Sequence, residues 1–453
     1  MIGLIENNLD SEDVKTLVFR LAIPSMLAQF VSVFYSIVDR MYIGNIPEIG
    51  EKALAGVGIC GPIVTLISSF AFLVGIGGAP LLSISLGRKD EKMAKKVLAN
   101  SFLLLSVLSI FLTIAAFLVK DWLLINFGAS EGIFSYADEY MSIYLLGTVF
   151  ALLAIGMNQF IICQGFAKVG MKSVLIGAVL NIVLDPIFIF AFDMGVKGAA
   201  YATIISQAIS CMVVLCFLFG KKIPIGITFH GYSLKVMGKI GLLGMTPFLI
   251  IAFDNILIIS LNSVISKYGG NQTEMLLTCT TIVQSFMLMI TMPLGGITGG
   301  TQTVLGFNYG ASRPDRIKKA FKWISLLCLL FTGTMFLFAQ TIPQYFARIF
   351  TGNPLYIEQT VWIIRRYTIG VIPLGIQYMI IDGLTGMGLA KYSITLSMLR
   401  KALFFAGVFL LPKIFGIFNV FYTEPISDII GTLCSILVFF LLVKPELERL
   451  KKG

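Results

Sequence analysis

The sequence predicts an all-α integral membrane protein with twelve transmembrane helices in two six-helix lobes related by an axis along the membrane normal. The composition is the first reason: mean hydropathy is +0.91 and only 13% of the 453 residues are charged, too few to cover a water-soluble surface. Apolar stretches of about 20 residues also recur along the whole chain, each long enough to cross a bilayer as a helix.

An internal repeat is the third reason. The first quarter of the chain falls on the start of the second half at a constant offset of 223 positions. The matched pairs include Pro24 and Pro247, Glu51 and Glu274, Gly77 and Gly300, and Gly87 and Gly310. Repeats of this kind place a binding site at their interface. Because each copy holds an even number of spans, both copies enter the membrane in the same direction.

The apolar stretches define the predicted spans in chain order. They are 16–44, 53–82, 97–119, 137–162, 173–192, 199–219, 239–266, 275–305, 320–341, 361–386, 393–414 and 424–443. Residues 1–220 therefore form an N-terminal six-helix lobe and residues 221–238 a cytoplasmic linker. Residues 239–453 form a C-terminal six-helix lobe with a short cytoplasmic tail.

The positive charges predict the orientation. Most of the 34 Lys and Arg residues lie at the two termini or in loops that follow even-numbered spans. Positive residues stay on the cytoplasmic side, so both termini are expected to be cytoplasmic in a multi-pass protein of the plasma membrane. The net charge of +10 calls for no nucleic-acid partner, because these residues are spread over short loops, where they meet anionic membrane lipid.

Sequence signatures of enzymes are missing from the chain. It has no GxxxxGK[ST] loop, GxSxG turn or HExxH motif. The one histidine, His230, cannot form a zinc site, and the seven cysteines lie mostly in apolar spans without a CxxC pair. We therefore expect no enzymatic activity, no cofactor and no metal beyond a possible Na⁺.

Ionisable residues inside spans are costly and are functional candidates. Asp39 lies late in the first span, and Asp185 lies in the fifth span one turn after Asn181, on the same helix face. At 1.5 Å per residue, Asp39 and Thr203 lie roughly 9 Å and Asp185 roughly 12 Å below the outer surface. These oxygens suit Na⁺ or two carboxylates that share a proton, unless each group is satisfied separately. Pro186 should bend the helix beside them.

The C-terminal lobe does not copy this set. Asp39 shifted by 223 falls on Asn262, and this lobe has other acids instead, Asp254 in the seventh span and Asp382 in the tenth. Tyr378 lies one turn before Asp382 on the same face. The two lobes therefore need not do the same job.

Along essentially its whole length the chain resembles the multidrug and toxic compound extrusion (MATE) family, most closely the bacterial branch with DinF- and MepA-like proteins. The segments that carry the resemblance are SIVDRMYIG at 36–44, ALAG at 53–56, LGRK at 86–89, NIVLDP at 181–186, GAAYAT at 198–203, GFNYGA at 306–311 and RIKK at 316–319.

The resemblance implies two lobes in a V around a central cavity, in a protein of the bacterial cytoplasmic membrane that functions as a monomer. It implies export of amphipathic, mainly cationic drugs or toxic organic compounds in exchange for inward H⁺ or Na⁺. The cation site of the family's N-lobe falls on Asp39, Asn181, Asp185 and Thr203. The C-lobe cation or substrate contacts of NorM-like members fall on Asp254, Tyr378 and Asp382. The family pattern has Glu where Asp254 stands, so this side chain is one methylene shorter.

A flippase for lipids or lipid-linked oligosaccharides, from the same superfamily, is the alternative. Such a protein needs cationic side chains that hold phosphate, and Arg40, Arg400 and Lys401 lie inside predicted spans. The acids in the spans favour cation handling instead. A channel or receptor is a further alternative, which tracer exchange distinguishes, because a channel shows no obligatory coupling to a counter-ion.

Overall fold

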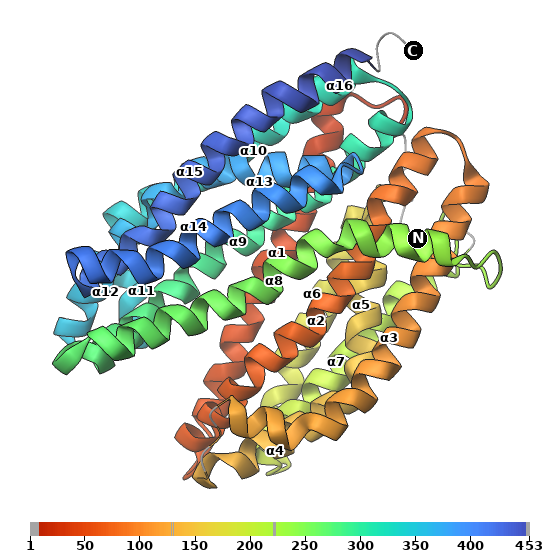
Figure 1. Cartoon of the computed structure of the whole chain (residues 1–453). Coiled ribbons are helices and arrows are strands. Elements are labelled where there is room, and N and C mark those ends of the chain that lie inside the picture. Colours follow the sequence, from red (N-terminus) through yellow and green to blue (C-terminus); the bar gives the residue numbers. More distant parts are fainter. Residues whose placement is uncertain (1–8, 128, 130, 221–222, 450–453) are drawn as a thin grey trace.

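The computed structural model describes residues 9–127, 129, 131–220 and 223–449, and these residues are helical nearly throughout, with no strand among them. Two helical bundles make up the molecule (Figure 1). The first contains α1 (Val14–Gly44), α2 (Gly50–Gly87), α3 (Glu91–Asn126), α4 (Glu131–Leu146), α5 (Thr148–Ile162), α6 (Ala167–Pro186), the π-helix η1 (Ile187–Ala191) and α7 (Gly195–Leu218).

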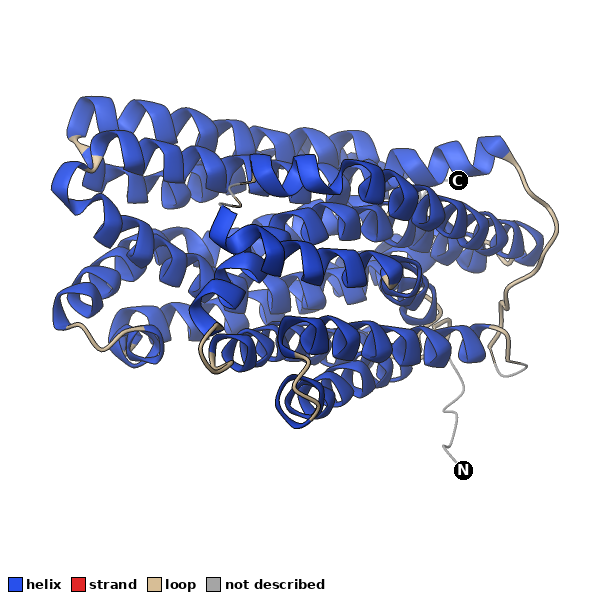
Figure 2. Ribbon diagram, turned by 90° about the horizontal axis from the view of Figure 1, so that it is seen from below, coloured by secondary structure: helices blue, strands red, loops and turns tan. Residues whose placement is uncertain are grey.

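The second bundle is built from the same number of spans. It contains α8 (Leu234–Tyr268), η2 (Gly270–Gln272), α9 (Thr273–Gly310), α10 (Pro314–Thr341), α11 (Pro343–Phe350), α12 (Pro354–Tyr367), η3 (Thr368–Gly370), α13 (Val371–Gly386), α14 (Ala390–Phe415), η4 (Ile417–Tyr422), α15 (Thr423–Val438), η5 (Phe439–Val443) and α16 (Lys444–Arg449). The helices of both bundles run in roughly the same direction across the molecule (Figure 2).

The predicted number of spans is confirmed. Eleven helices of the described chain are long and apolar enough to cross a membrane, and the bent pair Gly132–Leu146 and Thr148–Ile162 supplies the twelfth. This pair corresponds to the predicted span 137–162, and it bends by 57° at Gly147. Here α7 passes so close that a Cβ on Gly147 would lie 2.5 Å from Ile204. The all-α membrane fold follows from these spans.

Local sequence signals explain where several helices begin. The carboxylate of Asp13 accepts a hydrogen bond from the backbone N–H of Lys15 at the start of α1, and Asp90 accepts one from Met93 at the start of α3. Such caps satisfy amide groups that have no partner within the helix. Pro314 occupies the first turn of α10, where a missing N–H costs nothing.

The predicted linker is held against the first bundle. The side chain of Gln164 accepts a hydrogen bond from the backbone N–H of Ile225 at 2.8 Å and donates one to its carbonyl at 3.1 Å. Helix α8 begins at Leu234, so the last residues of the predicted 221–238 linker belong to that helix. Residues 221 and 222 lie outside the described part of the chain.

Repeated glycines bring the two bundles into contact. A Cβ on Gly87 of α2 would lie 2.0 Å from the carbonyl oxygen of Phe307 in α9. A Cβ on Gly310 of α9 would lie 2.1 Å from the carbonyl oxygen of Ile84 in α2. The repeat predicted that Gly87 and Gly310 are equivalent, and each packs against the helix that carries the other. Only glycine allows two backbones to approach so closely.

A second equivalent pair behaves in the same way. Gly77 of α2 packs on α8, where its Cβ would lie 2.2 Å from the carbonyl oxygen of Ile240. Gly300 of α9 packs on α1, where its Cβ would lie 2.5 Å from Oγ of Ser25. The beginning of α1 and helix α16 lie at one end of the molecule, and α4, α11 and α12 lie at the other (Figure 1).

Candidate functional site

Helices α1, α6 and α7 bring together the four residues predicted for the N-lobe. The amide Nδ2 of Asn181 donates to Oδ1 of Asp185 at 3.1 Å and to Oγ1 of Thr203 at 3.5 Å. The carboxyl groups of Asp39 and Asp185 lie within hydrogen-bonding reach of each other. Residues of three helices, with Asn181 and Thr203 22 positions apart in sequence, therefore form one polar cluster.

This cluster is short of hydrogen-bond donors. Asn181 and Asp185 are 2% and 0% exposed. Among the described residues, no donor contacts Oδ1 of Asp39, Oδ1 of Asn181 or Oδ2 of Asp185, although all three atoms are buried. Buried polar atoms in proteins nearly always have a partner. Three buried oxygens without donors on neighbouring side chains form a place where a proton or a small cation would be stabilised.

Tyrosines surround the cluster, and the sequence analysis did not select them. The hydroxyl of Tyr140 of α4 lies beside Thr203, and its ring stacks on Tyr144, with centroids 6.0 Å apart. Tyr144 lies in turn beside Gln207 of α7. The available signal was the spacing of Tyr140 and Tyr144, which places both hydroxyls on one face of an apolar helix.

Pro186 changes the hydrogen bonding of the helix beside the cluster. Helix α6 ends at this residue and continues as the π-helix η1. The backbone N–H of Ile187 bonds to the carbonyl of Leu184. Proline has no N–H to donate, so the regular ladder is lost one turn earlier, next to Asn181 and Asp185. The segment Ala167–Ala191 nevertheless remains one span.

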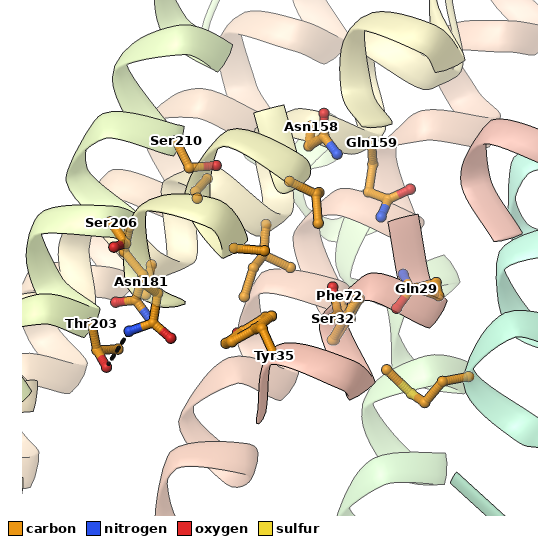
Figure 3. Close-up of a pocket in the computed structure, with 18 residues that line it drawn as sticks. Gln29, Ser32, Tyr35, Phe72, Asn158, Gln159, Asn181, Thr203, Ser206 and Ser210 are labelled. Atoms are coloured by element: carbon orange, nitrogen blue, oxygen red, sulfur yellow. Dashed lines mark hydrogen bonds between the residues drawn. The ribbon is translucent and has the colours of Figure 1, made fainter. Parts of the chain in front are cut away.

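A cavity of about 230 Å³ adjoins the cluster (Figure 3). Its lining is polar but uncharged on several helices and apolar elsewhere: Gln29, Ser32, Tyr35, Phe72, Ala151, Ala154, Ile155, Asn158, Gln159, Val174, Gly177, Ala178, Asn181, Thr203, Ser206, Gln207, Ser210 and Met292. Asn181 lines the cavity and also holds Asp185, so it connects the acids to the cavity. Met292 belongs to α9, so the cavity reaches the second bundle.

The three predicted C-lobe residues are arranged differently. Asp254 forms an ion pair with Lys401 of α14, and Asp382 accepts a hydrogen bond from Thr298 of α9. Tyr378 lines one cavity of about 60 Å³ with Asp382 and another of about 150 Å³ with Asp254. The structure thus places these residues around two adjoining cavities, and Asp254 has a basic partner that neither N-lobe acid has.

A second ion-paired group in the C-lobe was missed by the sequence analysis. Arg400 donates to Glu424 at 3.2 Å and to Asp428 at 2.7 Å. Tyr367 donates to Glu424 at 3.3 Å. The signal was available, because Glu424 and Asp428 are four residues apart on the face of one apolar span. A charge in hydrocarbon needs a partner, and Arg400 supplies it.

Two repeated bundles of six spans, with buried acids beside a cavity, define the chain as a membrane transporter rather than an enzyme. The chain belongs to the MatE family, whose sequence model matches residues 24–187 and 250–410. The multidrug export protein MepA of Staphylococcus aureus (strain NCTC 8325 / PS 47) is 22% identical over 426 residues, 93% of this chain and 92% of the relative. MepA of Staphylococcus saprophyticus is 23% identical with the same coverage. The predicted MepA-like branch is thereby confirmed.

Solved structures share the fold. One is the outward-facing conformation of a multidrug resistance MATE family transporter of the MOP superfamily, with a TM-score of 0.89, 23% identity and 98% of each chain covered. Another is a MOP superfamily transporter from Pyrococcus furiosus, whose binding pocket is described as having reverse polarity. It has a TM-score of 0.90 and 23% identity, with 99% of each chain covered.

Proposed function

We propose that this protein exports amphipathic, mainly cationic small molecules in exchange for H⁺ or Na⁺ that enters through the N-lobe. The observation that carries the proposal is the contact between Asp39 and Asp185 beside Asn181, with three buried oxygens that have no donor. The relatives named as multidrug export proteins support the substrate class.

The coupling ion follows from the chemistry of the two acids. Two carboxylates in contact repel each other, and burial penalises both charges, so a proton or Na⁺ bound between them relieves the repulsion. Asn181 and Thr203 add an amide and a hydroxyl oxygen, which Na⁺ would use and a proton would not need. We favour H⁺ as the physiological ion, with Na⁺ able to occupy the same site.

Transport requires that ion and substrate prefer different conformations. The bound ion removes the repulsion between the acids of α1 and α6 and so favours one packing of these helices. The helix would bend at Pro186 and at the π-helix η1 that follows it. A cationic substrate in the adjoining cavity is attracted by the same acids when the ion has left. Phe72 and Met292 supply adaptable apolar contact. Opposite preferences of ion and substrate produce antiport.

The orientation is part of the proposal. Most Lys and Arg residues lie near the termini or in loops that follow even-numbered spans. We assign the end of the molecule where the beginning of α1 and helix α16 lie to the cytoplasm (Figure 1). The glycine contacts between the lobes involve Gly87 and Gly310, close to this end, so the conformation is closed toward the cytoplasm. The monomer contains both lobes and the cavity, and it is proposed to act alone in the lipid bilayer.

The flippase alternative is less favoured by the C-lobe contacts. A phosphate group would need unoccupied basic side chains within the bundle. Arg400 is already bonded to Glu424 and Asp428, and Lys401 is bonded to Asp254. Arg40 is exposed and adjoins Asp39. Arg400 and Lys401 balance acids of the protein, so these two cations of the described C-lobe are not available to a phosphate.

Efflux in inverted membrane vesicles tests the proposal, with a pH gradient and a Na⁺ gradient applied separately. Asp39→Asn and Asp185→Asn should each abolish coupled uptake of an organic cation, at expression matched to the parent protein. Glu139→Gln is the control, because Glu139 is a partly exposed N-lobe acid paired with Lys197 at 3.5 Å. Normal efflux in either Asp variant would refute the N-lobe site. Efflux that follows only a Na⁺ gradient would overturn the preference for H⁺.

A further inference from the structure

Equivalent helix pairs carry different charges in the two lobes. In the N-lobe α1 packs on α6, and in the C-lobe the repeat partner of α1, helix α8, packs on α14. The first pair brings together two acids, Asp39 and Asp185. The second brings together an acid and a base, Asp254 and Lys401. Among the described residues no cation forms an ion pair with the N-lobe acids, although Arg40 is next to Asp39 in sequence, whereas the C-lobe acid has Lys401 as its ion-pair partner.

Lys401 forms an ion pair with Asp254. Its side chain is only 6% exposed, whereas that of Asp254 is 48% exposed, and both line the cavity of about 150 Å³. The neighbouring cation, Arg400, is bonded to Glu424 and Asp428 and so does not compete for Asp254. A buried ammonium group without a carboxylate would be strongly destabilised, and the same holds for a carboxylate in the membrane without a cation.

We propose that Lys401 is a tethered counter-cation, which supplies to Asp254 the positive charge that free H⁺ or Na⁺ supplies to the N-lobe acids. This inference rests on the proposed transport function and specifies which lobe takes the coupling ion. The C-lobe of this chain then takes up no free coupling cation at Asp254. Because a side chain cannot leave, the charge of this pair is the same in every conformation, and only the N-lobe responds to the ion gradient.

Other charged and titratable groups face the pair and belong to its surroundings. They are Arg400 on α14, Glu424 and Asp428 on α15, Tyr367 on α12, and Tyr378 and Asp382 on α13. Any of these acids could respond to pH by itself. A cation response is therefore assigned to Asp254 only where a substitution of Asp254 removes it.

The test measures how the thermal stability of purified variants depends on cations. All variants carry Asp39→Asn and Asp185→Asn, so that the N-lobe has no carboxylates at these positions to bind a cation. Melting temperatures are compared in NaCl and in choline chloride of equal ionic strength, at neutral and at acidic pH. The parent with Lys401 should show no difference between the two salts. Lys401→Met should melt at a lower temperature in choline at neutral pH, and Na⁺ or acid should restore part of the loss, because Asp254 is then without its cation.

Two control variants make the result specific. Lys401→Arg keeps the positive charge and should remain insensitive to Na⁺. Lys401→Met combined with Asp254→Asn removes both charges, so it should fold even if Lys401→Met alone does not, and it should show no response to Na⁺. A Na⁺ response of the parent that Asp254→Asn abolishes would overturn the proposal. A folded Lys401→Met variant that responds neither to Na⁺ nor to acid would also overturn it. Drug transport does not enter these measurements, so a failure of efflux in vesicles would refute the proposed function separately.

Discussion

Replacement of Gly310 by alanine should separate the two lobes at the end of the molecule where α2 and α9 pack together through Gly87 and Gly310. The added Cβ would lie 2.1 Å from the carbonyl oxygen of Ile84 and 2.9 Å from its Cα. Both are backbone atoms of α2, so no side-chain rotation can make room. An ordinary van der Waals contact begins at 3.4 Å. Helices α2 and α9 must therefore move apart by on the order of 1 Å, or the lobes must open.

The magnitude follows from the cost of overpacking. Extra atoms forced into a close-packed contact cost about 1–3 kcal/mol. In the proposed transport cycle this contact is broken when the two lobes part at this end, so the cost falls on the closed conformation. The equilibrium should therefore shift toward the conformation open at this end by roughly 5- to 150-fold. Gly87→Ala should act in the same direction, because its Cβ would lie 2.0 Å from the carbonyl oxygen of Phe307.

Distances between spin labels measure this shift. Labels at Lys92 of α3 and Lys318 of α10, both exposed, report the separation of the lobes in a cysteine-free background. Gly310→Ala should add a population at longer distance. The matched control is Gly299→Ala in the same helix, where an added Cβ meets nothing within 4 Å. An unchanged distance distribution and melting temperature in Gly310→Ala, or equal changes in Gly299→Ala, would refute the reasoning.

Three further predictions concern the polar sites. Asn181→Ala or Thr203→Ala should weaken Na⁺-driven efflux strongly and proton-driven efflux less, because the carboxylates remain; equal losses under both gradients would contradict a Na⁺ ligand role. Asp382→Asn should change substrate preference or affinity more than ion coupling, so an altered ion stoichiometry in transport assays would place coupling in the C-lobe. Tyr140→Phe removes the hydroxyl that lies beside Thr203 and should weaken Na⁺ binding several-fold, which corresponds to about 1 kcal/mol. Isothermal titration with Na⁺ checks this value, and unchanged affinity would remove Tyr140 from the site.

Much of the fold could be predicted because its causes are local or periodic. Apolar stretches long enough to cross a bilayer fix the number of spans. The structure differs in the bend at Gly147, where Ile204 of α7 packs closely, and in the start of α8 at Leu234 within the predicted linker. The offset of 223 identifies Gly87 and Gly310 as equivalent positions from the sequence alone. Asp39 and Asp185 could each be selected from the sequence as candidate site residues, because an acid within a membrane span is costly wherever it lies.

The sequence by itself therefore determined that this chain has twelve membrane spans and is a duplicated six-helix unit, and it predicted one depth for Asp39, Asn181, Asp185 and Thr203. Depth follows from the rise per residue along a helix, which is the same in every helix. Which side chains meet across helices depends on how each helix is rotated about its axis and on its neighbours, and no periodicity fixes either.

Only the tertiary structure, for that reason, joined Asp39 to Asp185 and added Tyr140 to their surroundings. The same packing gave Asp254 a lysine as its partner. One repeated architecture thus holds an acid pair without a cation in one lobe and an acid with its own cation in the other. The difference is decided by side chains that meet only when helices far apart in the sequence pack together.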